Sequence, residues 1–149
     1  MNSTELLRKT AKDLASRIDE ADDLVLRRVA AAIARGAIER TGLNHPLVSE
    51  AMACLESSGA PTPHLQKRLS SLVEELDEEY FRLQELEEDG DEEDTMALVA
   101  FSKARAAAAV TAALGPDVRA AAAEAAYEAI AAIDDLAYLT AIADKALAA

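Results

Sequence analysis

The residues of this chain whose types and spacing could do chemistry are the carboxylates between Glu74 and Asp94. Thirteen of the 28 acidic residues fall in that segment. Only one basic residue, Arg82, interrupts them, so the segment carries a net charge of −12 in a chain of net charge −13. A helix–loop–helix calcium site needs acidic ligands at alternate positions and a glycine at the sixth. In a loop that starts at Asp89, Gly90 falls at the second position, so the pattern does not predict a calcium site.

The histidines and the cysteine do not form a catalytic or metal-binding pattern. His45 and His64 each stand beside a proline at a predicted helix start, and neither belongs to a Glu-x-x-His or His-Glu-x-x-His motif. Cys54 is the single cysteine, and no histidine lies within four residues of it, so we expect a buried structural thiol. The chain also lacks a glycine-rich phosphate loop. We therefore expect neither an enzyme nor a bound cofactor or metal.

The acidic segment is more typical of a protein-binding surface. Dense negative charge repels nucleic acid and anionic membranes, and it attracts basic protein surfaces. Tyr80 and Phe81 lie inside the segment, and binding hot spots favour a tyrosine within a polar rim. In the alternative interpretation, the charges only solvate a helix face and one ring packs in the core. The side chains that we expect to bind a partner are Glu74, Glu75, Glu78, Glu79, Tyr80, Glu85, Glu87 and Glu88.

The elements that must position these side chains are helices. Alanine is the best helix former, and it occupies 24 of the 53 positions in residues 97–149. Apolar residues recur at intervals of three and four along most of the chain. The helices that this pattern predicts cover about residues 4–20, 23–40, 46–56, 63–88, 96–114 and 116–133, with a seventh after Asp134-Asp135.

Glycine and proline mark the ends of these helices. Gly42 stands where a helix C-terminal glycine in the left-handed conformation belongs. Pro46 and Pro63 each follow a polar capping residue and occupy a first helical turn. We expect linker-like structure over 58–63 and an exposed acidic loop over 87–94, because the latter is highly charged and contains a glycine.

These features predict an all-α fold, in which residues 1–149 form a single-domain antiparallel bundle of six or seven helices with the long helix 63–88 at its centre. The leucines from Leu65 to Leu86 form a stripe on that helix. The bundle could cover this stripe, or a twin helix from a second copy could, and the few large side chains lead us to expect a homodimer.

We expect the protein to be cytoplasmic. No uninterrupted apolar run reaches the ~18–20 residues of a membrane span, the N-terminus has no secretory signal pattern, and a single cysteine suits a reducing compartment.

One part of the chain resembles a known group of proteins. Residues 28–52, RVAAAIARGAIERTGLNHPLVSEAM, contain an arginine-bearing helix, a proline-containing loop and a helix with Glu-Ala at its centre. This stretch and the alanine-dense residues 104–132 resemble alanine-rich helical actinobacterial proteins classed as immunity proteins of polymorphic toxin systems. The resemblance implies a non-enzymatic protein that neutralises a toxin, and the acidic face would be its binding surface. The alternative is a structural or regulatory assembly protein that self-associates through the 65–86 apolar seam.

Overall fold

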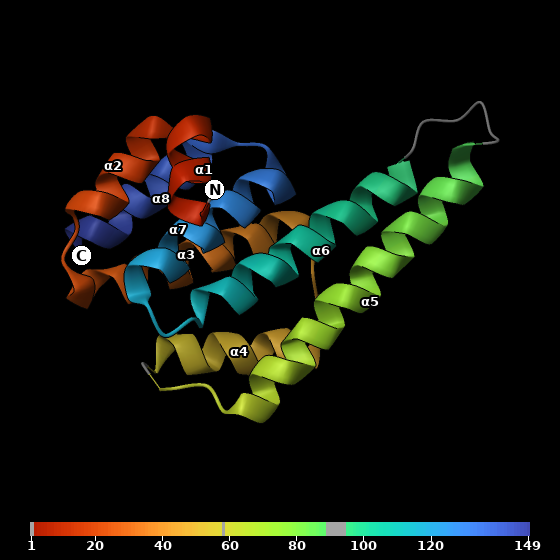
Figure 1. Ribbon diagram of the computed structural model, residues 1–149, viewed down its shortest axis with the longest axis horizontal. Coiled ribbons are helices and arrows are strands. Elements are labelled where there is room, and N and C mark those ends of the chain that lie inside the picture. Colours follow the sequence, from red (N-terminus) through yellow and green to blue (C-terminus); the bar gives the residue numbers. More distant parts are fainter. Residues whose placement is uncertain (1, 58, 89–94) are drawn as a thin grey trace.

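A computed structural model of the chain describes residues 2–57, 59–88 and 95–149. The described residues form an all-helical bundle (Figure 1). Its helices are α1 (Ser3–Thr10), α2 (Lys12–Glu20), α3 (Asp23–Thr41), α4 (Pro46–Glu56), α5 (Pro63–Glu88), α6 (Thr95–Ala113), α7 (Val118–Ile133) and α8 (Leu136–Ala148).

The expected count of six or seven helices is too low, because these residues form eight. The predicted helix over 4–20 is broken at Ala11, whose φ of −149° and ψ of 75° lie outside the helical region. Leu7, Leu14 and Ile18 are nevertheless all buried. The apolar spacing therefore continues across the break, and for this reason periodicity does not reveal it.

The other helix boundaries follow the sequence signals closely. Gly42 ends α3 with a φ of 71°, and its N–H donates to Ile38 O at 3.0 Å. The Nδ1 atom of His45 accepts from Leu47 N at 3.1 Å, so this histidine caps α4. The Thr62 hydroxyl accepts from Leu65 N at the start of α5. These caps satisfy backbone groups that a helix end leaves unpaired.

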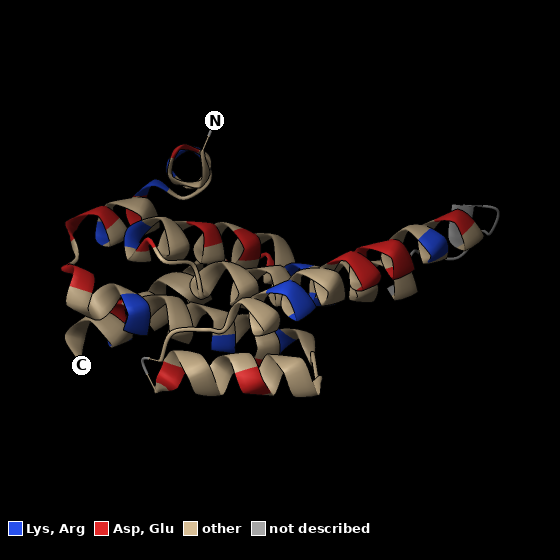
Figure 2. Cartoon of the chain, turned by 60° about the horizontal axis from the view of Figure 1, so that its bottom comes forward, with Lys and Arg blue, Asp and Glu red and all other residues tan. Residues whose placement is uncertain are grey.

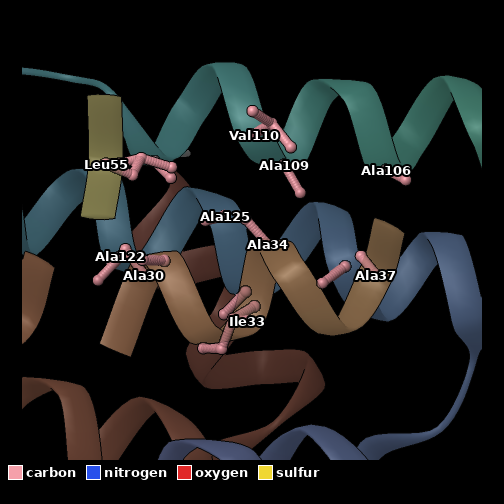
Figure 3. Packing of buried hydrophobic residues seen from close by; sticks show 14 of the residues in the cluster. Ala30, Ile33, Ala34, Ala37, Leu55, Ala106, Ala109, Val110, Ala122 and Ala125 are labelled. Atoms are coloured by element: carbon pink, nitrogen blue, oxygen red, sulfur yellow. The ribbon is translucent and has the colours of Figure 1, made fainter. Parts of the chain in front are cut away.

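The core lies where α3, α6 and α7 pack together, and much of it is alanine (Figure 3). Ala34 of α3, Ala109 of α6 and Ala125 of α7 are fully buried. Small side chains let helix axes approach closely. The packed trio joins α3 to two helices of the alanine-rich residues 97–149.

The long helix α5 is at the edge of the bundle, not at its centre. It packs against α6 and α4, and the α5–α6 pair extends beyond the other helices (Figure 1). Residues 78–88 of α5 and 95–101 of α6 are called the arm below. The two helices of the arm are held together by a small apolar cluster of their own. Leu83, Ala97 and Ala100 form this cluster, and Tyr80 packs beside them.

The leucine stripe of α5 is covered within the chain. Leu65, Leu69, Leu72 and Leu83 are buried against α4 and α6, and only Leu86 at the tip is exposed. A second copy therefore has no access to most of this seam. Self-association through residues 65–86, the alternative function given above, would require α6 to leave α5.

Helix α6 is the one helix among the described residues that is long and apolar enough to cross a membrane, over Met96–Ala113. The helices α3, α5 and α7 surround it, and Lys103 and Arg105 interrupt its apolar sequence. In this packing, 44% of the apolar window is buried inside the protein.

Candidate protein-binding site

The predicted binding residues lie on α5, where acidic residues occupy much of the part of the helix that extends beyond the rest of the bundle (Figure 2). The side chains of Glu74, Glu75, Glu78, Glu79 and Glu85 are exposed. Glu87 and Glu88 are in the last turn of α5, so these two residues of the expected loop over 87–94 are helical. Residues 89–94 and the side chains of Glu87 and Glu88 lie outside the described structure.

The two aromatic residues of the segment have different environments. Tyr80 is half-buried, and its ring centroid lies 5.3 Å from that of Phe101 on α6. Phe81 is 57% exposed and contacts Tyr80 on one side, with 5.2 Å between the ring centroids. Tyr80 therefore stabilises the arm, and Phe81 is the ring that a partner can reach. Sequence reasoning chose Tyr80 because tyrosine is the commoner hot-spot residue.

Acidic neighbours surround Phe81 on the helix surface. Glu78 is three residues before it and Glu85 four residues after it, so both share its face of α5. Glu74 lies one further turn toward the body. The geometry is that of an exposed apolar ring within a negative rim.

Two acidic residues of the segment are already paired. Arg82 donates to both carboxylate oxygens of Glu79, at 2.6 and 3.0 Å, and this contact lowers the pKa of Glu79. Arg105 of α6 contacts both Asp77 on α5 and Glu128 on α7. The carboxylates without an ion pair in the described structure are Glu74, Glu75, Glu78 and Glu85, and these are available to a partner.

Several basic side chains outside the arm also form hydrogen bonds within the fold. Arg27 donates to Ala113 O at 2.7 Å, at the end of α6. Arg28 donates to Ala146 O and Ala149 O, both at 2.9 Å, at the end of α8. A cation at a helix C-terminus is favourable because the last carbonyls carry partial negative charge. No sequence pattern identifies these long-range caps.

Cys54 and His64 are the remaining residues whose side chains could act in catalysis or bind a metal. Cys54 is half-buried, and its thiol lies 3.2 Å from Gly59 O. His64 is exposed at the start of α5. Among the described residues, no group of three or more histidine, cysteine, aspartate or glutamate side chains could hold a metal ion.

Comparison with known proteins finds no matching family model, no matching curated protein and no matching solved structure. The arrangement of the arm is therefore the main basis for a functional proposal.

Proposed function

We propose that this chain is a non-enzymatic, cytoplasmic protein-binding module whose acidic α5 face occupies a basic protein surface. The observation that carries this proposal is the exposed Phe81 within a rim of unpaired glutamates on a projecting helix pair. An apolar anchor within a polar rim is typical of a binding hot spot, because the rim excludes water from the anchor. The same negative surface disfavours nucleic acid and anionic membrane as partners.

The partner class that we propose is a basic toxin, in which case the chain acts as an immunity protein. The resemblance of residues 28–52 and 104–132 to actinobacterial immunity proteins supports this choice. Charge complementarity between the two proteins would also speed their association, since clustered charge steers diffusional encounter.

The test begins with capture of partners from the source cell at low salt and again at high salt. A captured basic protein is then purified, and its association and dissociation rates are measured with three forms of this chain. These are wild type, the triple variant Glu74→Gln/Glu78→Gln/Glu85→Gln, and a control with the same change of charge elsewhere, Glu5→Gln/Glu20→Gln/Glu50→Gln. All six glutamates are exposed.

The proposal requires that the arm variant associate more slowly than the control variant. Wild-type binding should also weaken between low and physiological salt, since exposed charges are screened over ~8–10 Å. Phe81→Ala should raise the dissociation rate with little effect on association. Equal rates for the two triple variants, together with salt-independent affinity, would rule out recognition by the acidic face.

A further inference from the structure

Exposed apolar side chains gather on the arm. Seven large hydrophobic residues are exposed in the described structure, and five of them belong to the arm. These five are Phe81, Leu86, Met96, Leu98 and Val99. Leu98 is 60% exposed and Val99 is 46% exposed, although both occupy a helix that is otherwise largely covered. Leu98 and Val99 also line the same cavity, and adjoining exposed apolar residues of this kind indicate an interaction site.

The register of α6 explains why Leu98 is exposed. Ala106, Ala109 and Ala113 of α6 are buried in the core that α6 forms with α3 and α7. Residues spaced by three and four share one helix face, so Leu98 and Ser102 continue that same stripe towards the N-terminus of α6. Helix α3, however, ends at Thr41, and α7 ends at Ile133. The stripe extends past both ends, and no further helix of the described residues covers it there.

A groove of about 330 Å³ lies at this point. Leu98, Val99 and Ser102 of α6 form one wall, and the ends of α7 and α3 form the other, through Ala132, Ile133, Arg40 and Thr41. The Arg40 guanidinium is already bonded to Asp135 at 2.7 Å and lies over the Tyr138 ring. Its positive charge is therefore already paired with a carboxylate of the same chain.

The surroundings of the groove carry more negative than positive charge, since Glu39, Asp134 and Asp135 outnumber Arg40 and Lys103. Two helix C-termini, those of α3 and α7, meet there, and each carries a partial negative charge. Glu39 and Asp134 are exposed and adjoin lining residues in the sequence, and neither forms an ion pair in the described structure. Lys103, which adjoins Ser102 and is half-buried, is the one basic residue among those described that lies beside the groove apart from Arg40. The exposed Glu78 and Glu85 lie on α5 of the same arm. An occupant of this groove must be apolar on one side and basic on its flanks.

We propose that one amphipathic helix of the basic partner docks in this groove, with its apolar face on Leu98, Val99 and Ile133 and its lysines and arginines toward the acidic surroundings. A helix suits the site because it completes the layer that α3 and α7 leave unfinished. A second copy of the chain would bring another segment of net charge −12 against the first, which like-charge repulsion opposes. This inference rests on the proposed function, since it assigns an additional contact to the same partner.

The probe for this site is a synthetic peptide of about 18 residues, long enough for five helical turns, made of leucine and lysine with the leucines on one helix face. A second peptide of equal composition has its leucines distributed around the helix. Binding is measured by fluorescence anisotropy at physiological salt. Three proteins are compared: wild type, Leu98→Gln/Val99→Gln, and Leu24→Gln, which replaces a 92% exposed leucine away from the arm.

The amphipathic peptide should bind wild type and Leu24→Gln equally, and Leu98→Gln/Val99→Gln about tenfold more weakly or worse, since two partly exposed aliphatic contacts are lost. The distributed peptide should bind all three proteins alike. Methyl resonances of Leu98, Val99 and Ile133 should shift when the amphipathic peptide is added, whereas those of Leu24 should not. Thermal unfolding of each variant establishes that the fold is kept.

Equal affinity of the amphipathic peptide for wild type and Leu98→Gln/Val99→Gln would overturn the groove proposal. The acidic-face proposal has its own test in the Glu74/Glu78/Glu85 variant, so either proposal can fail alone. Concentration-dependent dimerisation of wild type that Leu98→Gln/Val99→Gln abolishes would also overturn it, because a second copy would then occupy the groove.

Discussion

Arg105 of α6 forms an ion pair with Asp77 of α5 through one nitrogen. Its Nη2 atom donates to both carboxylate oxygens, at 2.8 and 3.0 Å. Its Nη1 atom donates to Glu128 of α7 at 2.8 Å. One guanidinium therefore joins three helices at the base of the arm. The side chain of Arg105 is 20% exposed, so water screens these contacts only partly.

Arg105→Met should destabilise the protein by about 2 kcal/mol, because it leaves two partly buried carboxylates without their partner. Chemical denaturation measures the change. Arg82→Met is the matched control, since Arg82 pairs only with the exposed Glu79, and it should leave the denaturation midpoint unchanged. Equal effects of the two variants would show that Arg105 has no special role at the base of the arm.

The pH dependence of stability should report on Glu128. Burial raises the pKa of its carboxyl above the ordinary value of 4.5, although Arg105 opposes the shift. The folded protein thus binds this proton more tightly than the unfolded chain does. The contribution of Glu128 to stability should decline as the pH rises from 4.5 through the folded pKa. Glu128→Gln should remove that decline when unfolding is measured across this range.

Asp135 provides a contrast of opposite sign. Hydrogen bonds from the Tyr138 N–H and from Arg40 hold the pKa of its carboxyl below 3.8. Its contribution is present above pH 3.8 and is lost as the pH falls through the lower folded value. Asp135→Asn should therefore change the pH profile only below that point. If both variants altered the same pH range, the assignment to these two groups would be wrong.

Gly42 should tolerate substitution poorly, because its φ of 71° lies in the left-handed region. Gly42→Val should cost on the order of 1–2 kcal/mol of unfolding free energy. Gly42→Asn should cost less, since asparagine adopts this conformation more readily. No atom lies within 4 Å of a Cβ built at this position, so the loss would be conformational and not steric. Thermal unfolding that ranks the two variants equally would contradict this explanation.

Arg119 should be essential for the junction between α2 and α3. Its guanidinium donates to Ile18 O, Asp19 O and Ala21 O, which end α2, and to the Asp23 carboxylate. Arg119→Lys keeps the charge but cannot span four acceptors. Hydrogen exchange in α1 and α2 should accelerate in this variant, while exchange in the α3–α6–α7 core should change less. Unchanged exchange in α2 would show that packing alone holds this junction.

Local signals in the sequence predict local structure well here. Gly42, Pro46 and Thr62 act through their own backbone geometry, and the ends of α3, α4 and α5 lie where these residues predict. The contacts of Arg105 and Arg119 join segments 23 to 101 residues apart. The spacing of residue types along one sequence does not predict contacts between residues so far apart in the chain.

The position of the long helix shows the same limit. The leucines of α5 predict a buried stripe, and Leu69 is fully buried. The stripe does not indicate which helix covers it. Much of it is covered by α6, which follows the acidic segment in the sequence. For the same reason the sequence does not reveal that Leu98 and Val99 extend past the ends of α3 and α7. The glutamates of the candidate site were predicted from composition, whereas the groove required the fold.

The charge of α5 should lower the stability of the isolated protein. Glu74 and Glu78 are four residues apart on one helix, and Glu78 and Glu85 lie along the same exposed face, so their repulsion opposes helix formation. Glu74→Gln/Glu78→Gln/Glu85→Gln should therefore raise the thermal midpoint more at low salt than at high salt, since salt screens the repulsion. The control Glu5→Gln/Glu20→Gln/Glu50→Gln removes the same charge from separated positions and should have a smaller effect. A variant that gains stability and loses association rate with a basic partner would mean that the protein retains these glutamates for binding. A thermal midpoint that falls in the arm variant would show that the glutamates stabilise α5, and solvation of the helix would then explain them without a partner.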